Sequence, residues 1–125
     1  MNQIIHTDRA PAAIGPYSQA VKAGNLLFVS GQLPIDPATG AFSGEDIASQ
    51  TRQSLTNVRS ILEEAGYALS DVVKTTVLLA DIGDFTAMNA VYAEFFTSNC
   101  PARAAFAVKD LPKGAKVEIE VIASK

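Results

Sequence analysis

Residues 47–66, IASQTRQSLTNVRSILEEAG, carry the clearest helical pattern in the chain. Apolar and small side chains recur there at steps of four and three, which places them on one face of an α-helix. We expect Ser43, with Asp46 three residues later, to begin this helix as a capping box in which Asp replaces the usual Glu. Gly66 is suited to end it in a left-handed cap. The predicted buried face consists of Ile47, Thr51, Leu55, Val58, Leu62 and Ala65.

Strand patterns lie on both sides of this helix. Gly24-Asn25 is a two-residue hairpin signal between two short apolar runs, so the chain is expected to open with a β-meander. Residues 72–80, VVKTTVLLA, are rich in β-branched side chains and too apolar for an exposed strand, which predicts a central one. The predicted strands span residues 3–7, 17–23, 26–31, 72–80, 103–108 and 116–124.

A second helix is predicted from a cap at Asp81 or Asp84 to about Thr97. Its apolar stripe consists of Phe85, Met88, Tyr92 and Phe95. The resulting element order is βββαβαββ, which indicates an α+β fold with two helices on one face of a mixed sheet. The other face of that sheet has no helix to cover it.

The last strand has strict alternation. Val117, Ile119 and Val121 point to one face, and Glu118 and Glu120 point to the other, because successive side chains of a strand alternate.

The 125 residues, of 13.2 kDa, are near the usual size of one domain, so a single domain over residues 1–125 is expected. Hydrophobic residues make up 48% and charged residues only 18%, which favours some apolar surface being used in a subunit interface. The net charge of -3, with no run of Lys or Arg, provides no basic surface for a polyanion. Nucleic acid is therefore not expected as a partner.

Cys100 is the only cysteine, so no internal disulfide is possible and a reducing, cytoplasmic location is the simpler expectation. Cys100 itself is interpreted as a packed thiol. The N-terminal residues lack the pattern of a signal peptide, and no apolar run approaches the ~20 residues that a membrane helix needs. We expect no membrane association.

The residues that several common kinds of catalytic site require are absent from the sequence. His6 is the only histidine, so convergent metal ligands are not expected. Ser30, in VSGQLP, has no nucleophile-elbow pattern and no other histidine to act as its base, which disfavours a covalent triad. Neither GxxxxGK nor GxGxxG occurs. No cofactor is predicted.

Arg103 and Glu118 remain as candidates for chemistry. Arg103 stands in PARAAF, within a strand predicted to be buried, where an unpaired guanidinium is costly. It could bind a small carboxylate bidentately while a partly desolvated Glu118 orients or deprotonates water. It could also be a buried ion-pair partner of Glu118 or Glu120, and those glutamates could be the solvated face of an edge strand. The residues alone leave these alternatives open.

Taken in order and spacing, several stretches resemble the reactive intermediate deaminase (RidA, or YjgF) family over essentially the whole chain. The PAR stretch followed by LPKGAKVEIE is typical of the active members of that family. The matching stretches are APAAIGPYSQAV, FVSGQLPIDPATG, QTRQSLTNVRSILEEAG, VVKTTVLLADIGDF, MNAVYAEFF, PARAAFAV and LPKGAKVEIEVIA.

The resemblance implies a chorismate-mutase-like fold, assembled as a homotrimer with the sheets packed inward and a ligand site at each subunit interface. It also implies hydrolysis of 2-iminopropanoate and 2-iminobutanoate to 2-oxo acids and ammonia, without a cofactor. Those imines arise from enamines that damage pyridoxal phosphate enzymes, so the implied role is protective.

By the same resemblance, Arg103 holds the substrate carboxylate, and Glu118 positions water and manages the proton at the imine nitrogen. Many relatives have a cysteine where this chain has Ala105, whose backbone carbonyl could hold water equally well. The substrate-binding positions implied are Tyr17, Ser30, Gly31, Asn89 and Ala105.

Two other functions compete with this one. The same trimer could bind 2-oxo acids or similar carboxylates without turnover, or act in a chaperone-like way. Ribonuclease or translation-inhibitor activity is attributed to some relatives, but the acidic pI of about 5.0 and the single histidine disfavour it.

Overall fold

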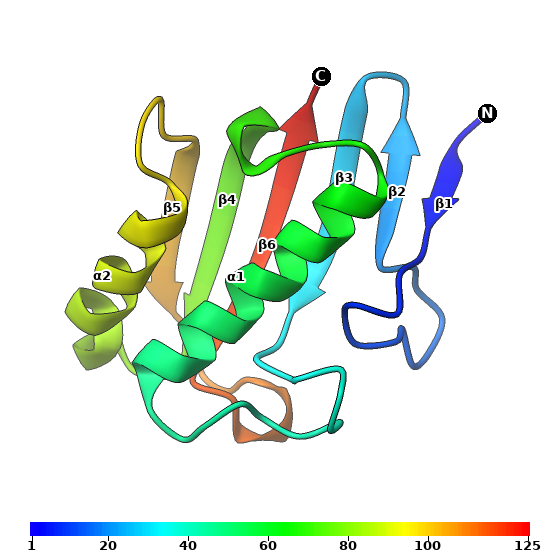
Figure 1. Cartoon of the computed structure of the whole chain (residues 1–125). Coiled ribbons are helices and arrows are strands. Elements are labelled where there is room, and N and C mark those ends of the chain that lie inside the picture. Colours follow the sequence, from blue (N-terminus) through cyan, green and yellow to red (C-terminus); the bar gives the residue numbers. More distant parts are fainter.

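The computed structural model describes residues 1–125, and it is built from a six-stranded sheet with two helices packed on one face (Figure 1). The strands are β1 (Gln3–Ile5), β2 (Ala20–Ala23), β3 (Leu26–Gln32), β4 (Val72–Leu79), β5 (Ala102–Ala107) and β6 (Val117–Ser124). The helices are α1 (Ile47–Glu64) and α2 (Phe85–Phe95), with single 3-10 turns at Leu69–Asp71, Ile82–Asp84 and Pro112–Gly114. The predicted βββαβαββ order is confirmed.

The strands are arranged in the order β1-β2-β3-β6-β4-β5. Every neighbouring pair is antiparallel except β4 and β5, which are parallel and are joined through α2. A parallel pair needs such a crossover connection, whereas β2 and β3 are joined by the predicted two-residue hairpin. Gly24 takes a φ of +62° in that hairpin, a conformation that glycine adopts without a steric penalty.

Helix α1 begins differently from the prediction. Asp46 is the N-cap residue, and its carboxylate accepts a hydrogen bond from the Ser49 backbone N–H at 3.0 Å. The Ser43 hydroxyl instead donates to the Ser49 carbonyl, because the chain at Ser43 has not yet reached the helix. Gly66 follows the helix with a φ of +83°, as the sequence predicts.

The core lies between the helices and one face of the sheet (Figure 1). Val117, Ile119 and Val121 of β6 are at most 2% exposed, so the predicted alternation of that strand is confirmed. β6 lies between β3 and β4, which makes it a central strand, and the edge-strand interpretation of its glutamates is wrong. Burial of such side chains stabilises the fold by about 1.5–3 kcal/mol each.

The helix-free face carries exposed apolar side chains. Leu26, Phe28 and Phe106 are 40%, 43% and 47% exposed. Scattered apolar residues are normal on a surface, but three large ones on one sheet face form a surface suited to contact with another molecule.

β5 is an edge strand, and the prediction that its residues are buried is wrong. It pairs only with β4, so one of its edges is free of strand partners. The Arg103 residue is consequently exposed to solvent in the single chain and does not lie in an apolar interior.

Candidate functional site

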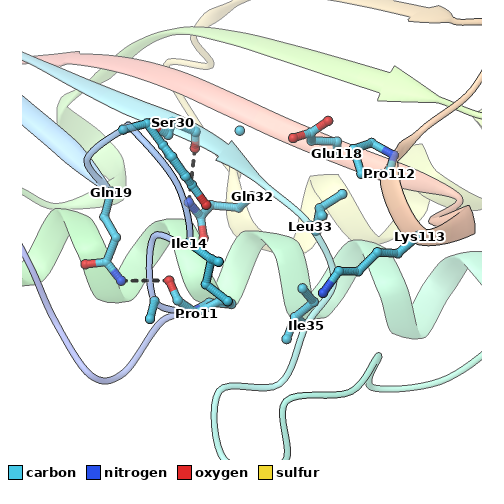
Figure 2. A pocket seen from close by; sticks show the side chains of 13 residues that line it. Pro11, Ile14, Gln19, Ser30, Gln32, Leu33, Ile35, Pro112, Lys113 and Glu118 are labelled. Carbon is cyan, nitrogen blue, oxygen red and sulfur yellow. Dashed lines mark hydrogen bonds between the residues drawn. The ribbon is translucent and has the colours of Figure 1, made fainter.

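All but one of the site residues predicted from the sequence line one of two hollows. Four of them line a cavity of about 470 Å³ at the end of β3 and the start of β6, which we name the Glu118 cavity (Figure 2). They are Tyr17, Ser30, Gly31 and Glu118. Its volume lies within the range of roughly 300–1,000 Å³ that is usual for small-molecule sites.

The Glu118 carboxylate lies directly against Gly31. A Cβ atom at position 31 would stand 2.5 Å from Glu118 Oε2, so the close approach depends on the missing side chain. Glu118 is half-buried, and burial raises the pKa of its carboxyl above the usual 4.5, with a further upward contribution from Glu120. A carboxyl with a raised pKa, in contact with a cavity, is a candidate for proton transfer.

The hydrogen bonds of Ser30 hold the segment that precedes β2. Its hydroxyl donates to the Ser18 carbonyl at 2.6 Å, and its backbone N–H donates to the Gln19 carbonyl at 2.9 Å. The buried Gln19 side chain in turn donates to the Pro11 carbonyl (Figure 2) and to the Thr7 carbonyl. Ser30 therefore orders the loop that carries Tyr17, whose side chain is 53% exposed.

The remaining wall consists of the segment after β3 and the turn before β6. Leu33 and Ile35 lie on one side of it, and Pro112 and Lys113 lie on the other (Figure 2). Lys113 takes a φ of +60°, which is uncommon for a residue with a side chain. Sequence reasoning did not place this turn in the cavity; the only available signal was the PKG triplet close to Glu118.

Arg103 lies in a second hollow, of about 460 Å³, which we name the Arg103 hollow. Its Nη1 donates to Asn89 Oδ1 at 2.7 Å, and its guanidinium stands 4.7 Å from the centre of the Tyr92 ring and 5.5 Å from that of Phe85. Stacking on aromatic rings and one hydrogen bond hold the guanidinium in place while leaving most of its five N–H donors free.

Sequence reasoning placed Asn89 in the site but treated Tyr92 and Phe85 only as apolar helix residues. The three recur at steps of four and three, so they share one face of α2, and this was a usable signal. The Tyr92 hydroxyl is also hydrogen-bonded to Thr75 Oγ1 at 2.8 Å. Burial raises the pKa of the Tyr92 hydroxyl, so it stays protonated at neutral pH. Cys100, expected as a packed thiol, is exposed at the rim of the Arg103 hollow.

The two hollows lie on opposite faces of the sheet. Arg103 is aligned with Thr75 of β4, which is buried under α2, whereas Glu118 is aligned with Leu78 of the same strand. Positions 75 and 78 differ by an odd number, so their side chains point to opposite faces. Ala105 packs against the core and lines neither hollow.

Arg103 takes part in none of the ion pairs of the chain, which join His6 to Asp8, Arg9 to Glu63 and Glu64, and Arg52 to Glu94. The interpretation of Arg103 as a buried partner of Glu118 or Glu120 is therefore wrong.

No group of three or more His, Cys, Asp or Glu side chains is arranged to hold a metal ion. Neither helix is long and apolar enough to cross a membrane.

Comparison with known proteins gives close matches. Residues 7–125 match the model of the family described as Endoribonuclease L-PSP. A RutC family protein of Pyrococcus horikoshii is 57% identical over 125 residues, which cover 100% of this chain and 99% of the relative. A 2-iminobutanoate/2-iminopropanoate deaminase of Salmonella typhimurium is 51% identical over 126 residues, which cover 98% of each.

Among solved structures, E. coli TdcF with bound serine superimposes with a TM-score of 0.95 at 44% identity, over 98% of both chains. The match confirms the α+β fold.

Proposed function

We propose that this chain, which belongs to the Endoribonuclease L-PSP family and within it resembles the RidA proteins, hydrolyses the carbon–nitrogen double bond of small 2-imino acids. The products are a 2-oxo acid and ammonia. Two observations support the proposal: relatives at 51–53% identity are named 2-iminobutanoate/2-iminopropanoate deaminases, and TdcF, with the same fold, carries bound serine, a small amino acid.

The active unit in this proposal is a homotrimer whose sites lie between subunits. The Glu118 cavity and the Arg103 hollow lie on opposite faces of one sheet, so a second copy is needed to bring the two charged groups onto one small substrate. The exposed Leu26, Phe28 and Phe106 on the helix-free face supply apolar surface for inward packing of the sheets. A molecular mass of three times 13.2 kDa in solution is the expected result.

Arg103 binds the substrate carboxylate in this site. Asn89 bonds to one edge of the guanidinium, and the rings of Tyr92 and Phe85 lie against its face, so the guanidinium is oriented before substrate arrives. The carboxylate of a planar 2-imino acid can accept two parallel hydrogen bonds from the guanidinium N–H groups. The Arg103 arrangement is the observation that carries the proposal, because it is an ordered cation with free donors and no anionic partner in the chain.

Glu118 transfers the proton. The reacting form is the iminium ion, whose nitrogen carries an extra proton. Water adds to its carbon as the Glu118 carboxylate accepts one of the water protons, which leaves a neutral amino alcohol. The carboxyl then returns that proton to the nitrogen, the carbon–nitrogen bond breaks, and the hydroxyl proton passes to the Glu118 carboxylate as the carbonyl forms. Ammonia takes up that proton and leaves as ammonium. The raised pKa of Glu118 strengthens it as a base for the first step and suits its return as an acid.

The remaining predicted positions have supporting parts in this scheme. Tyr17, Ser30 and Gly31 line the Glu118 cavity and shape the space in front of the carboxylate. The Ala105 backbone carbonyl, beside Arg103 on the free edge strand, is proposed as an acceptor for the hydrolytic water.

The test is an assay in which a serine or threonine dehydratase produces the imine and semicarbazide traps what survives. The wild-type protein is expected to accelerate imine loss, and Arg103→Ala to lose about 100-fold in kcat/KM, since a charge-assisted bidentate contact contributes about 3 kcal/mol. His6→Ala, at an exposed position that lines neither hollow, is the matched control and keeps full activity.

Two results contradict the proposal. Wild-type protein that leaves the imine unchanged, while 2-oxobutanoate raises its melting temperature, identifies a binding module without turnover. Full activity in Arg103→Ala removes the residue on which the scheme depends. The family description names an RNA-cleaving activity, but the only histidine is exposed and paired with Asp8 outside both hollows, so nothing in the site favours that reaction.

A further inference from the structure

Helix α1 carries four polar side chains on its buried face. Gln50, Thr51, Ser54 and Asn57 are each at most 3% exposed, although the buried face of an amphipathic helix is ordinarily apolar. They divide into two kinds. The hydroxyls of Thr51 and Ser54 have no hydrogen-bond partner, whereas both ends of the Gln50 and Asn57 amides are bonded.

Asn57 holds the segment that leaves β3. Its Nδ2 donates to the Leu33 carbonyl at 3.2 Å and to the Ile35 carbonyl at 2.9 Å, while its Oδ1 accepts from Gln53 at 2.8 Å. β3 ends at Gln32, so these two carbonyls lie beyond the ladder of the sheet. Asn57 supplies the donors that the ladder no longer provides. Leu33 and Ile35 both line the Glu118 cavity (Figure 2).

Gln50 holds the other side of the same cavity. Its Oε1 accepts from the Lys116 backbone N–H at 2.8 Å, and its Nε2 donates to the Gly44 carbonyl at 3.0 Å. Lys116 lies two residues before Glu118 and three residues after Lys113, which lines the cavity. Gln50 therefore fixes the chain between the Pro112–Gly114 turn and β6.

The two amides belong to one rigid element. They are seven residues apart, about two helical turns, and so they lie on the same face of α1 at a fixed separation of about 10 Å. One amide holds the Leu33–Ile35 wall and the other holds the chain that follows the Pro112–Lys113 wall. Neither residue lines the cavity itself.

We infer that Gln50 and Asn57 are positioning residues that set the spacing of these two walls and thereby the size of the acid side chain that the Glu118 cavity accepts. The inference about substrate size rests on the proposed function, whereas the inference about the walls does not. The chemical step depends on Glu118 and Arg103, so loosening the walls weakens substrate binding and size selectivity more than it slows turnover.

The decisive variant is Asn57→Asp. It keeps the volume of the side chain but replaces the Nδ2 donor with an acceptor facing two carbonyl oxygens. Ser54→Ala is the matched control, because it removes a buried polar atom from the same helix face without removing any wall contact. Gln50→Met and Gln50→Glu form a second pair: the first loses the Lys116 contact and the second keeps it, so the pair decides the question if Asn57→Asp does not fold.

The first measurement is backbone amide hydrogen exchange, which needs no turnover. We expect Asn57→Asp to accelerate exchange at Asp36 and Ser43, whose backbone N–H groups donate to the Ala41 and Pro34 carbonyls and so hold the wall segment in place. We expect Gln50→Met to accelerate exchange at Lys116, whose N–H loses its acceptor. The amides of β6 keep wild-type protection in both variants, and Ser54→Ala changes neither wall. Unchanged exchange at the wall residues overturns the inference, whatever the assay shows.

The second measurement compares imines derived from 2-aminobutanoate and from leucine. For Asn57→Asp we expect KM for the four-carbon imine to rise about tenfold with kcat within about twofold, from the loss of two hydrogen bonds of ordinary strength. The preference for the small imine over the leucine-derived one falls about fivefold. A lower melting temperature with unchanged KM and unchanged preference identifies a purely structural role and overturns the inference.

The two failures are distinguishable. If the wild-type protein hydrolyses neither imine, the proposed function fails, and the hydrogen exchange still decides whether Gln50 and Asn57 hold the walls. If turnover is present and the preference does not change, the proposed function stands and the positioning role falls.

Discussion

The Glu118 cavity and the Arg103 hollow hold their charged groups in different ways. Arg103 is held by its neighbours' side chains, with Asn89 bonded to the guanidinium and two aromatic rings under its face. Glu118 is held by its place on a central strand against Gly31, and the influences on its carboxyl are burial and Glu120, both of which raise its pKa. In the proposed reaction, the ordered guanidinium serves in binding and the desolvated carboxylate serves in proton transfer.

This difference is the reason why the proposed site needs more than one chain. An ordered cation beside a desolvated carboxylate in the same cavity would form an ion pair. That pair would lower the pKa of the carboxylate and occupy the guanidinium N–H donors. Placing them on opposite faces of the sheet keeps both available. In the proposed trimer they face each other only across a boundary that substrate can enter.

Glu118→Gln has the largest expected effect. Because the amide neither accepts nor returns the proton, kcat falls about 1,000-fold, as for the loss of a general acid–base group. Binding of 2-oxobutanoate, measured by the rise in melting temperature, changes little because Arg103 is intact. A kcat within tenfold of wild type contradicts the role of Glu118.

Gly31→Ala ranks next. The new Cβ would stand 2.5 Å from Glu118 Oε2, so the carboxylate must move, and since it is the end of a flexible side chain the fold tolerates the change. We expect kcat to fall about 100-fold with little change in melting temperature. In a Glu118→Gln background the same substitution costs almost nothing further, because the two changes act on one group. Additive losses would show that Gly31 acts elsewhere.

Asn89→Ala has a smaller effect, confined to the Arg103 hollow. The guanidinium loses its hydrogen bond but keeps both rings, so KM rises about tenfold while kcat is nearly unchanged. Asn2→Ala, at an exposed N-terminal position, is the control. If kcat falls and KM does not change, Asn89 acts on the chemical step and not on carboxylate binding.

The smallest effect is on stability. Because the folded pKa of Glu118 is raised, its contribution to stability is fully present below the unfolded pKa of 4.5 and is lost as pH rises through the folded value. Glu118→Gln has no proton to lose, so its melting temperature should exceed that of wild type by about 2 °C near pH 7. The difference should disappear near pH 4. Glu45→Gln, in an exposed loop, is the control, and a destabilised Glu118→Gln at neutral pH contradicts the assignment.

The spacing of apolar residues within single helices and strands predicted most of the fold. The steps of four and three in residues 47–66 and the alternation in β6 depend only on which side chains face the core, and both are confirmed. The strand at β5 was predicted, but its expected burial was wrong: AAFA is apolar enough for an interior strand, and burial there depends on which strands pair with it. Strand order is set by contacts between distant segments, which local sequence does not encode.

The candidate site was predicted only in part for the same reason. The resemblance supplied Arg103 and Glu118, but their placement on opposite faces follows from the register of β5 and β6 against β4. Tyr92 and Phe85 could have been found from their spacing with Asn89. The wall contacts of Gln50 and Asn57 could not, because they join a helix to segments 22 to 66 residues away in the sequence.

The central claim is that one site takes Arg103 from one subunit and Glu118 from another. It is tested most directly by mixing two inactive proteins, Arg103→Ala and Glu118→Gln, and allowing their subunits to exchange. With random exchange in a closed ring, about a quarter of the sites contain both intact groups, so imine hydrolysis should return to about a quarter of the wild-type rate. Activity that stays at the level of the separate variants, after mass spectrometry has shown mixed trimers, contradicts the account.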